Sequence, residues 1–304
     1  MKASKVLVVL VVILISILLL YFIFRPNQTE ISEYSFFILD DVTEIGEGEY
    51  LCSFEGVNHN YILDLPDRID DAPLVIMLHG YGSNARSFRL DTGFEKEANL
   101  KGYAVAYVTG APSPEDSTSA TGWNSGIGKS GNNDVGFLCA LANYLCKTYS
   151  FDSNRVFAVG FSNGAFMTHR LATEANDVFA AAVSVAGLMP ESVWNSRPDR
   201  CSIGFFQITG EKDDAVPKYS DDSAKYTNAP AIEDVVEYYV NANALDLSET
   251  CPAGKKAILT KYSSPDSVKE IWNLFIPDGR HSWPSESFTG ININELILEF
   301  LDTQ

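Results

Sequence analysis

Apolar runs of strand length alternate with helical patterns along most of this chain, and this alternation constrains the fold more than any other feature. The runs that have the length of buried strands are PLVIMLHG, YAVAYV, RVFAVG, FAAAVSVAG, GFFQITG and VKEIWNLFI. Helical patterns cover residues 91–101, 134–149, 164–174, 230–243 and 292–302. This order predicts an α/β fold, in which helices cover both faces of a mostly parallel, twisted sheet. We expect a single domain that opens with an antiparallel hairpin made of EYLCSF and HNYILDL.

The N-terminal run over residues 6–24 is apolar except for one serine, and it is long enough to cross a bilayer core as a helix. Two lysines precede the run and acidic residues follow it, so the positive-inside bias places the start of the chain in the cytoplasm. We predict a signal anchor over 1–25, a tether over 26–45 and a folded domain over 46–304, which lies outside the cytoplasm. A cleaved signal peptide, which would release a secreted protein, is the alternative.

Charge and cysteine content exclude several classes of partner. The formal net charge is −18, and a chain this acidic repels nucleic acid. No C-x-x-C or H-E-x-x-H spacing occurs, so we expect no metal. The catalysis predicted below needs no cofactor. Cys139 and Cys146 lie on one predicted helix, about 10 Å apart and too far to bridge. Cys201 with Cys251 is the pair we would test for a disulfide. The oligomeric state is not indicated.

The segment AVGFSNGA contains the pattern G-x-S-x-G, with Ser162 at its centre. Ser162 follows the predicted strand RVFAVG and precedes the helical pattern GAFMTHRLATEA. A sharp turn between a strand and a helix presents the hydroxyl at the carboxyl end of the sheet, in front of a helix N-terminus. We therefore predict that Ser162 is a nucleophile; an ordinary turn capped by a serine is the alternative.

A serine nucleophile needs a base, and the base needs an acid that orients it. Of four histidines, His281 lies in the loop PDGRHSWPS after a late strand, where it could reach the nucleophile, whereas we expect His79 in LHGYG to be structural. The loop EKDDAVP supplies the acid. We predict Asp213 and keep Asp214 as the alternative, because sequence spacing alone hardly distinguishes the two. The order Ser, Asp, His is that of the α/β-hydrolase triad.

The segment MLHGYGSN follows the first long apolar strand. Its glycines, Gly80 and Gly82, allow unusual backbone dihedrals and a close approach to a substrate. We predict that the backbone N–H groups of Tyr81 and Asn163 form an oxyanion hole. A glycine-rich turn without a catalytic part is the alternative.

These motifs together resemble the exported α/β-hydrolase esterases related to feruloyl esterases and polyhydroxybutyrate depolymerases, an LpqC-like group similar to carbohydrate esterase family 1. The resemblance covers nearly all of the chain after the N-terminal run. It implies an α/β-hydrolase fold, and it favours Asp213 as the acid because this residue precedes x-x-V-P. The oxyanion position maps onto Tyr81, where relatives often have cysteine, and a tryptophan that lines the cleft in relatives corresponds to Trp123. The segments that carry the resemblance are NYILDLP, PLVIMLHGYGSNARSF, NNDVGFLCALANYLCKTYSFDSNRVFAVGFSNGAFMTHRLA, ITGEKDDAVP and GRHSWP.

Two tryptophans stand in loops near the predicted site. A flat aromatic face suits a phenolic acyl group or a sugar ring, so we predict Trp123 and Trp283 as substrate-binding residues, with plain packing as the alternative. Trp123 belongs to the aperiodic segment 109–133, and loops of that length inside a domain are often functional. Asp134, which follows this segment, is expected to cap the next helix rather than to act as a catalytic acid.

The sequence therefore predicts a serine carboxylesterase that acts through an acyl-enzyme. We expect feruloyl or acetyl esters on polysaccharide-derived substrates, small or polymer-borne, and contact with the membrane through the N-terminal helix. A polyhydroxyalkanoate (polyester) depolymerase and a serine peptidase would use the same triad and remain alternatives. A non-catalytic binding protein is a further alternative, although such a protein would normally have lost a triad residue.

Overall fold

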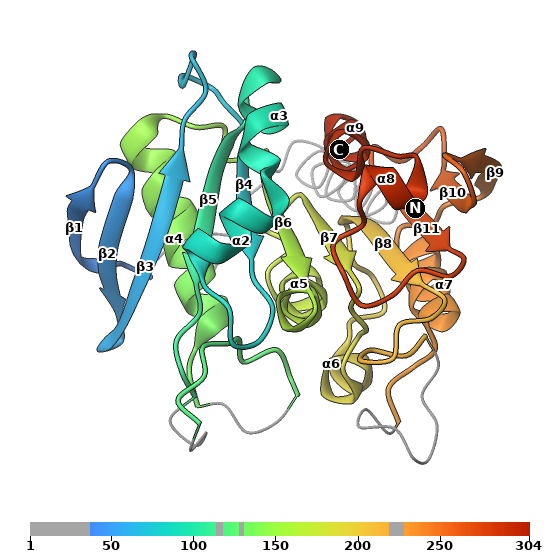
Figure 1. The fold of residues 1–304 in the computed structure, drawn as a ribbon, viewed down its shortest axis with the longest axis horizontal. Helices are drawn as coiled ribbons and strands as arrows, with labels where there is room; N and C mark the ends of the chain where they lie inside the picture. The colour runs from blue at the N-terminus through green and yellow to red at the C-terminus, as the bar shows by residue number, and fades with distance from the viewer. Residues whose placement is uncertain (1–36, 114–117, 128–130, 219–227) are drawn as a thin grey trace, which may run out of the picture.

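A mixed β-sheet with helices on both faces organises the domain (Figure 1). The structure, a computed structural model, describes residues 37–113, 118–127, 131–218 and 228–304. Within these ranges eleven strands form one sheet in the order β1-β2-β3-β5-β4-β6-β7-β8-β11-β10-β9. Figure 1 shows this order from β1 on the left to β9 on the right. The predicted α/β class is thus confirmed.

The elements alternate along the chain as the apolar runs predict. The strands are β1 (Asp40–Gly46), β2 (Glu49–Phe54), β3 (Val57–Asp64), β4 (Leu74–Leu78), β5 (Ala104–Thr109), β6 (Val156–Phe161), β7 (Ala181–Val185), β8 (Gly204–Gly210), β9 (Leu247–Ala253), β10 (Ala257–Ser263) and β11 (Ile271–Ile276). The helices are α2 (Ala85–Thr92), α3 (Phe94–Leu100), α4 (Asp134–Tyr149), α5 (Asn163–Glu174), α6 (Glu191–Ser196), α7 (Ile232–Ala242), α8 (Glu286–Thr289) and α9 (Ile293–Asp302).

The middle of the sheet is parallel and both sides are antiparallel. Strands β5, β4, β6, β7, β8 and β11 run in one direction. Strands β3, β2 and β1 continue the sheet antiparallel on one side, and β10 and β9 do so on the other. Because parallel strands end at the same edge of a sheet, the loops after β4, β6, β8 and β11 lie along one edge. All of the predicted catalytic residues belong to these loops.

The parallel strands are buried on both faces, which explains their continuous apolar runs. In β4, Leu74, Ile76 and Leu78 pack into a core formed with α4, α5 and α7. The alternate residues Val75 and Met77 pack into a second core, formed with α2, α3 and α9. Successive side chains of a strand point to opposite faces of the sheet, so a strand that is buried on both faces needs an apolar residue at every position. The two cores together hold the carboxyl edge of the sheet in place.

Helix boundaries differ from the prediction where capping residues decide them. The predicted helix over 91–101 is two helices: α2 already begins at Ala85, after an Asn84 side chain that accepts the Ser87 N–H, and it ends at Thr92. Gly93 separates α2 from α3 because it adopts a left-handed φ of 55°. Strands β9 and β10 were not predicted; polar and apolar side chains are mixed in both, β9 is largely exposed and β10 is mostly half-buried.

The N-terminal prediction is tested only over its last part. The predicted anchor over 1–25 and the tether as far as residue 36 lie outside the described residues. In the part of the chain that the structure describes, no helix is long and apolar enough to span a membrane. Strand β1 contains residues 40–45, which the sequence prediction assigned to the tether, and it pairs with β2.

All five cysteines lie in the described ranges, and each is a free thiol. The proposed disulfide between Cys201 and Cys251 is therefore wrong. Cys251 belongs to β9, which lies three strands from β8 and so about 14 Å away at the usual strand spacing. Cys201, just before β8, is buried, and its thiol donates to the Ala172 carbonyl oxygen at 2.9 Å.

Candidate active site

Ser162 lies in a strained turn between β6 and α5. Its φ of 53° and ψ of −117° are dihedrals that residues other than glycine rarely adopt. A Cβ placed on Gly160 would lie 2.2 Å from the Gly164 carbonyl oxygen, and one placed on Gly164 would lie 2.1 Å from the Leu78 oxygen. Both glycines of the G-x-S-x-G pattern are thus required by close backbone contacts. The turn has the geometry of a nucleophile elbow.

The structure brings together the three side chains predicted to form a triad. His281 Nε2 lies 2.9 Å from Ser162 Oγ, and His281 Nδ1 lies 2.8 Å from Asp213 Oδ2. The Asp213 side chain is 1% exposed, whereas that of His281 is 20% exposed. A buried carboxylate, an imidazole and a hydroxyl therefore form one continuous hydrogen-bonded chain. This chain can move a proton from the hydroxyl to the imidazole while the carboxylate stabilises the imidazolium.

The first of the two adjacent aspartates is the one that meets the histidine. Asp213 Oδ1 accepts the backbone N–H groups of Ala215 at 3.0 Å and Val216 at 2.7 Å, which leaves Oδ2 for His281. Asp214 is exposed. The loop itself thus orients the Asp213 carboxylate, and the choice that spacing left open is decided by its turn geometry.

Backbone hydrogen bonds join the loop of the acid to the loop of the histidine. The Lys212 N–H donates to the Gly279 oxygen at 2.7 Å, and the Glu211 N–H donates to the Ile276 oxygen at 3.0 Å. A Cβ on Gly210 would lie 2.6 Å from the Gly279 carbonyl, so the two chains are in close contact. These bonds fix the separation of Asp213 and His281 without using a side chain.

The predicted oxyanion donors lie on the loops after β4 and β6. Asn163 is the first residue of α5, so its N–H has no acceptor within the helix. The Ser162 N–H, by contrast, donates to the Val185 oxygen at 3.0 Å. Gly80, which precedes Tyr81, lies against the nucleophile: a Cβ placed on it would be 3.3 Å from the Ser162 Cβ. The two loops are therefore adjacent, and the role of Tyr81 and Asn163 in binding an oxyanion stays a prediction.

His79 is structural, as predicted. The Gly110 N–H donates to its Nε2 at 3.0 Å, so its Nδ1 carries the proton and donates to the Gly80 oxygen at 2.7 Å. The side chain is fully buried, and this burial lowers the pKa of His79 to about 4. A neutral imidazole therefore fixes the loop that carries Tyr81 to the end of β5.

The two predicted substrate-binding tryptophans both point into the protein. Trp123 is 4% exposed, and its indole Nε1 donates to the His79 oxygen at 2.9 Å. Trp283 is half-buried; its Nε1 donates to Asn294 Oδ1 at 3.1 Å, and its ring meets the edge of Phe88 at 5.6 Å. These contacts do not fit the predicted wall of a substrate pocket. Packing is the better description, because each indole N–H has its partner inside the domain.

Residues 118–127, here called the strap, cross the loop after β4. The Gly82 N–H donates to the Thr121 oxygen at 2.7 Å, and Thr121 Oγ1 donates to the Ser83 oxygen. The sequence indicated a long aperiodic loop here but did not identify the side chains that hold it.

Asp134 is one of the side chains that hold the strap: its Oδ2 accepts the Asn124 N–H at 2.6 Å. Asp134 does not cap α4 as expected, because the Asn133 side chain accepts the capping bond.

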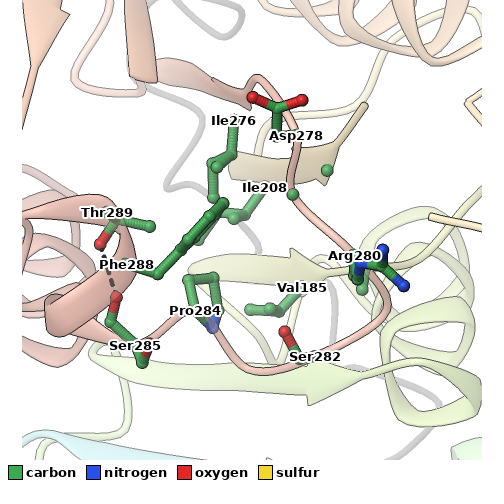
Figure 2. Close-up of a pocket in the computed structure, with 13 residues that line it drawn as sticks. Val185, Ile208, Ile276, Asp278, Arg280, Ser282, Pro284, Ser285, Phe288 and Thr289 are labelled. Carbon is green, nitrogen blue, oxygen red and sulfur yellow. Dashed lines mark hydrogen bonds between the residues drawn. The ribbon is translucent and has the colours of Figure 1, made fainter. Parts of the chain in front are cut away.

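A cavity of about 290 Å³ lies beneath the loop that carries His281 (Figure 2). Its floor is the ends of β7, β8 and β11, with Val185, Ile208 and Ile276. Figure 2 shows Phe288 of α8 reaching over this floor, while the Arg280 side chain lies at the side. Among the described residues, those that line the cavity include neither Ser162 nor His281. The cavity therefore lies behind the histidine loop rather than over the nucleophile.

Named relatives of this chain include esterases. One relative is NocK of Nocardia uniformis subsp. tsuyamanensis, which is named provisionally as an esterase. It is 28% identical over 239 residues, which cover 71% of this chain and 67% of NocK. Feruloyl esterase B of Thermothelomyces thermophilus is 28% identical over 151 residues, or 49% of each chain. The chain thus spans about half to two thirds of the length of these curated relatives.

A solved structure shares the fold. The acetyl xylan esterase from Aspergillus awamori superposes with a TM-score of 0.57 over 88% of this chain and 99% of its own, at 16% identity. This likeness shows that the domain has the α/β-hydrolase fold. Together with the named relatives, it confirms the predicted resemblance to α/β-hydrolase esterases and supports the class of carboxylic ester hydrolase.

One family model matches the chain. It is described as the prolyl oligopeptidase family, and it matches residues 94–246, half of the chain. The matched span includes the nucleophile turn and the loop of Asp213, and it ends before His281. By this match across an α/β-hydrolase domain, the chain belongs to the prolyl oligopeptidase family.

Proposed function

We propose that this protein is a serine carboxylesterase that hydrolyses esters through an acyl-enzyme on Ser162. The observation that carries the proposal is the hydrogen-bonded chain from Asp213 through His281 to Ser162, with the serine on a strained turn at the start of α5. A hydroxyl in that position has a base at 2.9 Å, and the base has a buried carboxylate at 2.8 Å. This is the arrangement that an acyl transfer to serine requires.

The reaction follows from the contacts. His281 Nε2 accepts the proton of Ser162 as Oγ attacks the ester carbonyl, and the Asp213 carboxylate stabilises the imidazolium through Nδ1–H. The carbonyl oxygen gains negative charge and is held by the N–H groups of Tyr81 and Asn163. His281 then gives the proton to the departing alkoxide, which leaves as the alcohol. Water attacks the acyl-enzyme with His281 again as base, and this step releases the acid and restores Ser162.

The proposed substrates are feruloyl or acetyl esters borne by polysaccharide-derived alcohols. The support is the naming of one relative as a feruloyl esterase and of one structural neighbour as an acetyl xylan esterase. The exposed ring of Tyr81, 58% accessible beside the proposed oxyanion hole, offers an aromatic surface for an acyl group. The proposed location is outside the cytoplasm, with residues 1–25 as a membrane anchor.

A peptidase is the second candidate, because the matching family is that of prolyl oligopeptidase. The same triad would attack an amide, but the leaving amine must then be protonated by His281 before the C–N bond breaks. Esters have a better leaving group and react more readily at the same site. A substrate series that varies only the leaving group therefore separates the two activities.

The test is hydrolysis of matched esters and amides by the full chain in detergent. Methyl ferulate, p-nitrophenyl acetate and a polyhydroxybutyrate film report the ester classes, and peptide anilides report the peptidase. We expect turnover of the small esters and a loss of at least about 10⁴-fold in kcat for Ser162→Ala. A fluorophosphonate should label the parent protein but not this variant. Ester turnover that persists in Ser162→Ala would remove the proposed mechanism.

A further inference from the structure

The side chain of Asn163 is held by the strap. Its Oδ1 accepts the Trp123 N–H at 2.7 Å, and its Nδ2 donates to Ser125 Oγ at 3.0 Å and to the Trp123 oxygen at 3.4 Å. The amide thus pairs with both backbone groups of one strap residue, as a neighbouring strand would. A residue whose own N–H is a proposed oxyanion donor is in this way tied to a distant segment by its side chain.

The strap in turn holds the loop of the second proposed donor. Thr121 makes two hydrogen bonds to the residues that follow Tyr81: its oxygen accepts the Gly82 N–H at 2.7 Å, and its hydroxyl donates to the Ser83 oxygen. Gly122 fills the space between the two donor residues. A Cβ on Gly122 would lie 3.1 Å from Asn163 Oδ1 and 3.2 Å from the Tyr81 ring.

The far part of the strap is fixed to three helices. The Asn124 N–H donates to Asp134 of α4, and its carbonyl oxygen accepts from Arg170 of α5. Beyond it, Ser192 Oγ of α6 donates to the Gly126 oxygen at 3.0 Å. Because the strap is anchored in this way, its position relative to the sheet is set independently of the loop after β4. The strap can therefore hold the loop after β4 in a defined position.

We propose that Asn163 is a positioning residue, whose side chain sets, through the strap, the separation between its own N–H and the N–H of Tyr81. The proposal rests on the esterase function proposed above. An oxyanion hole needs both donors about 2.7–3.1 Å from one oxygen, yet here the donors belong to different loops. The hydrogen bonds between Asn163 and Trp123, and between Thr121 and the Tyr81 loop, join those two loops through the strap.

The first test is Asn163→Ala in the full chain, which keeps the backbone N–H and removes the link to the strap. A displacement of about 1 Å in a reacting geometry costs about 10²-fold, so we expect kcat to fall between about 10- and 100-fold for every ester that the parent hydrolyses. KM should stay within about threefold. Asn154→Ala is the control: its amide donates to Asp152 before β6, at the other end of that strand from Ser162, and it should leave kcat unchanged.

A second variant reaches the same link without touching the nucleophile turn. Ser125→Ala removes one of the two acceptors of Asn163 Nδ2, and we expect a smaller loss of kcat, about three- to tenfold, because the bonds to Trp123 remain. This variant keeps the proposal testable if Asn163→Ala does not fold. Wild-type kcat in Asn163→Ala would overturn it, and if Asn163→Ala does not fold, wild-type kcat in a folded Ser125→Ala would do so.

A double-mutant cycle distinguishes positioning from independent damage. Thr121→Val keeps the volume of the side chain and removes the hydroxyl that donates to Ser83. If Asn163 and Thr121 act through one strap, the double variant should lose little more activity than Asn163→Ala alone. Losses that multiply would show two separate effects and would overturn the proposal.

Hydrogen exchange gives a readout that does not need turnover. In Asn163→Ala, the amides of Trp123 and Gly82 should exchange faster, while amides of the β9–β10 hairpin should not change. A parent protein that hydrolyses no ester would contradict the proposed function. A parent that hydrolyses esters, with unchanged kcat and unchanged exchange in Asn163→Ala, would contradict the positioning role alone.

Discussion

The two sides of Ser162 differ in the kind of hydrogen bond that predominates. On the acid–base side, the loops after β8 and β11 are joined by backbone groups, such as the Lys212 N–H and the Gly279 oxygen. On the oxyanion side, buried side chains join the loop after β4 to the strap and to β5, and His79 and Trp123 are examples. A backbone bond survives most substitutions, whereas a side-chain bond depends on one residue type.

This difference predicts where the site tolerates change. On the acid–base side, the identity of a side chain should matter where it does chemistry, at Asp213 and His281, and where a close backbone contact requires glycine, as at Gly210. On the oxyanion side, several residues that do not touch the substrate should matter, because each satisfies a buried backbone group. The following substitutions test this contrast.

The largest effect is expected at the acid. Asp213→Asn should lower kcat about 10³- to 10⁴-fold, because an amide cannot hold the imidazole in the required tautomer or stabilise the imidazolium. The adjacent, exposed Asp214 provides the matched control, and Asp214→Asn should keep kcat within about twofold. Steady-state hydrolysis of p-nitrophenyl acetate measures both variants. Equal losses in the two would mean that the loop, rather than one carboxylate, carries the effect.

A smaller effect is expected at the buried histidine of the oxyanion side. His79→Leu leaves the buried Gly110 N–H without a partner, whereas the Gly80 oxygen keeps the Ser83 N–H, so the free energy of unfolding should fall by about 1–3 kcal/mol. We also expect kcat to fall about 10- to 100-fold, because the Tyr81 loop loses its support. Urea unfolding and ester hydrolysis measure the two quantities.

His59→Leu is the comparison for that variant. His59 is also buried, but it lies in β3 and stacks on Phe137 with ring centroids 3.6 Å apart. Its substitution should lower the free energy of unfolding and leave kcat unchanged. A similar loss of kcat in both variants would show that general destabilisation, and not the support of the Tyr81 loop, lowers the activity of His79→Leu.

The same contrast explains how much the sequence could predict. The six parallel strands and the residues Ser162, Asp213 and His281 were predicted, because long apolar runs mark strands buried on both faces and each of these residues follows one such run. Strands β9 and β10 were missed, because polar and apolar residues are mixed in these antiparallel strands and neither has the continuous apolar run of a parallel strand buried on both faces.

The tryptophans show what local sequence does not contain. Trp123 lies in a loop, which suggested a substrate wall, but its indole donates to His79, 44 residues earlier in the chain. The orientation of Trp283 likewise depends on Asn294 in α9 and Phe88 in α2. A pattern of residue types places such a side chain near the site, but only the packed structure decides which way it points.

A pH-dependent effect on stability is expected at the anchor of the strap. Burial raises the pKa of Asp134 from 3.8 to about 6. A raised folded-state pKa contributes stability that is present below about pH 4 and is lost as the pH rises through about 6. At about 1.4 kcal/mol per unit, the parent should therefore lose up to about 3 kcal/mol between pH 4 and pH 7.5 relative to Asp134→Asn. Urea unfolding of both proteins across this range measures the difference.

Asp152→Asn is the control, because the stability that Asp152 contributes should change with pH in the opposite direction. The hydrogen bond from Arg155 lowers the pKa of Asp152, so its contribution to stability is present above the unfolded pKa and is lost as the pH falls. The parent should therefore gain stability relative to Asp152→Asn as the pH rises. Two variants with the same slope would contradict the assignment of Asp134 as a buried carboxylate that prefers to be neutral.

The smallest effect is expected at Lys212 on the acid–base side. Its side chain forms an exposed ion pair with Asp278, while its backbone N–H donates to the Gly279 oxygen in the histidine loop. An exposed ion pair of this kind contributes little to stability, so Lys212→Ala should leave both kcat and the urea midpoint unchanged within error. Lys212→Pro removes the N–H and should lower kcat, because the loops of Asp213 and His281 then lose a shared bond. If the alanine variant were as impaired as the proline variant, the ion pair rather than the backbone would hold the two loops together, and the contrast between the two sides of Ser162 would fail.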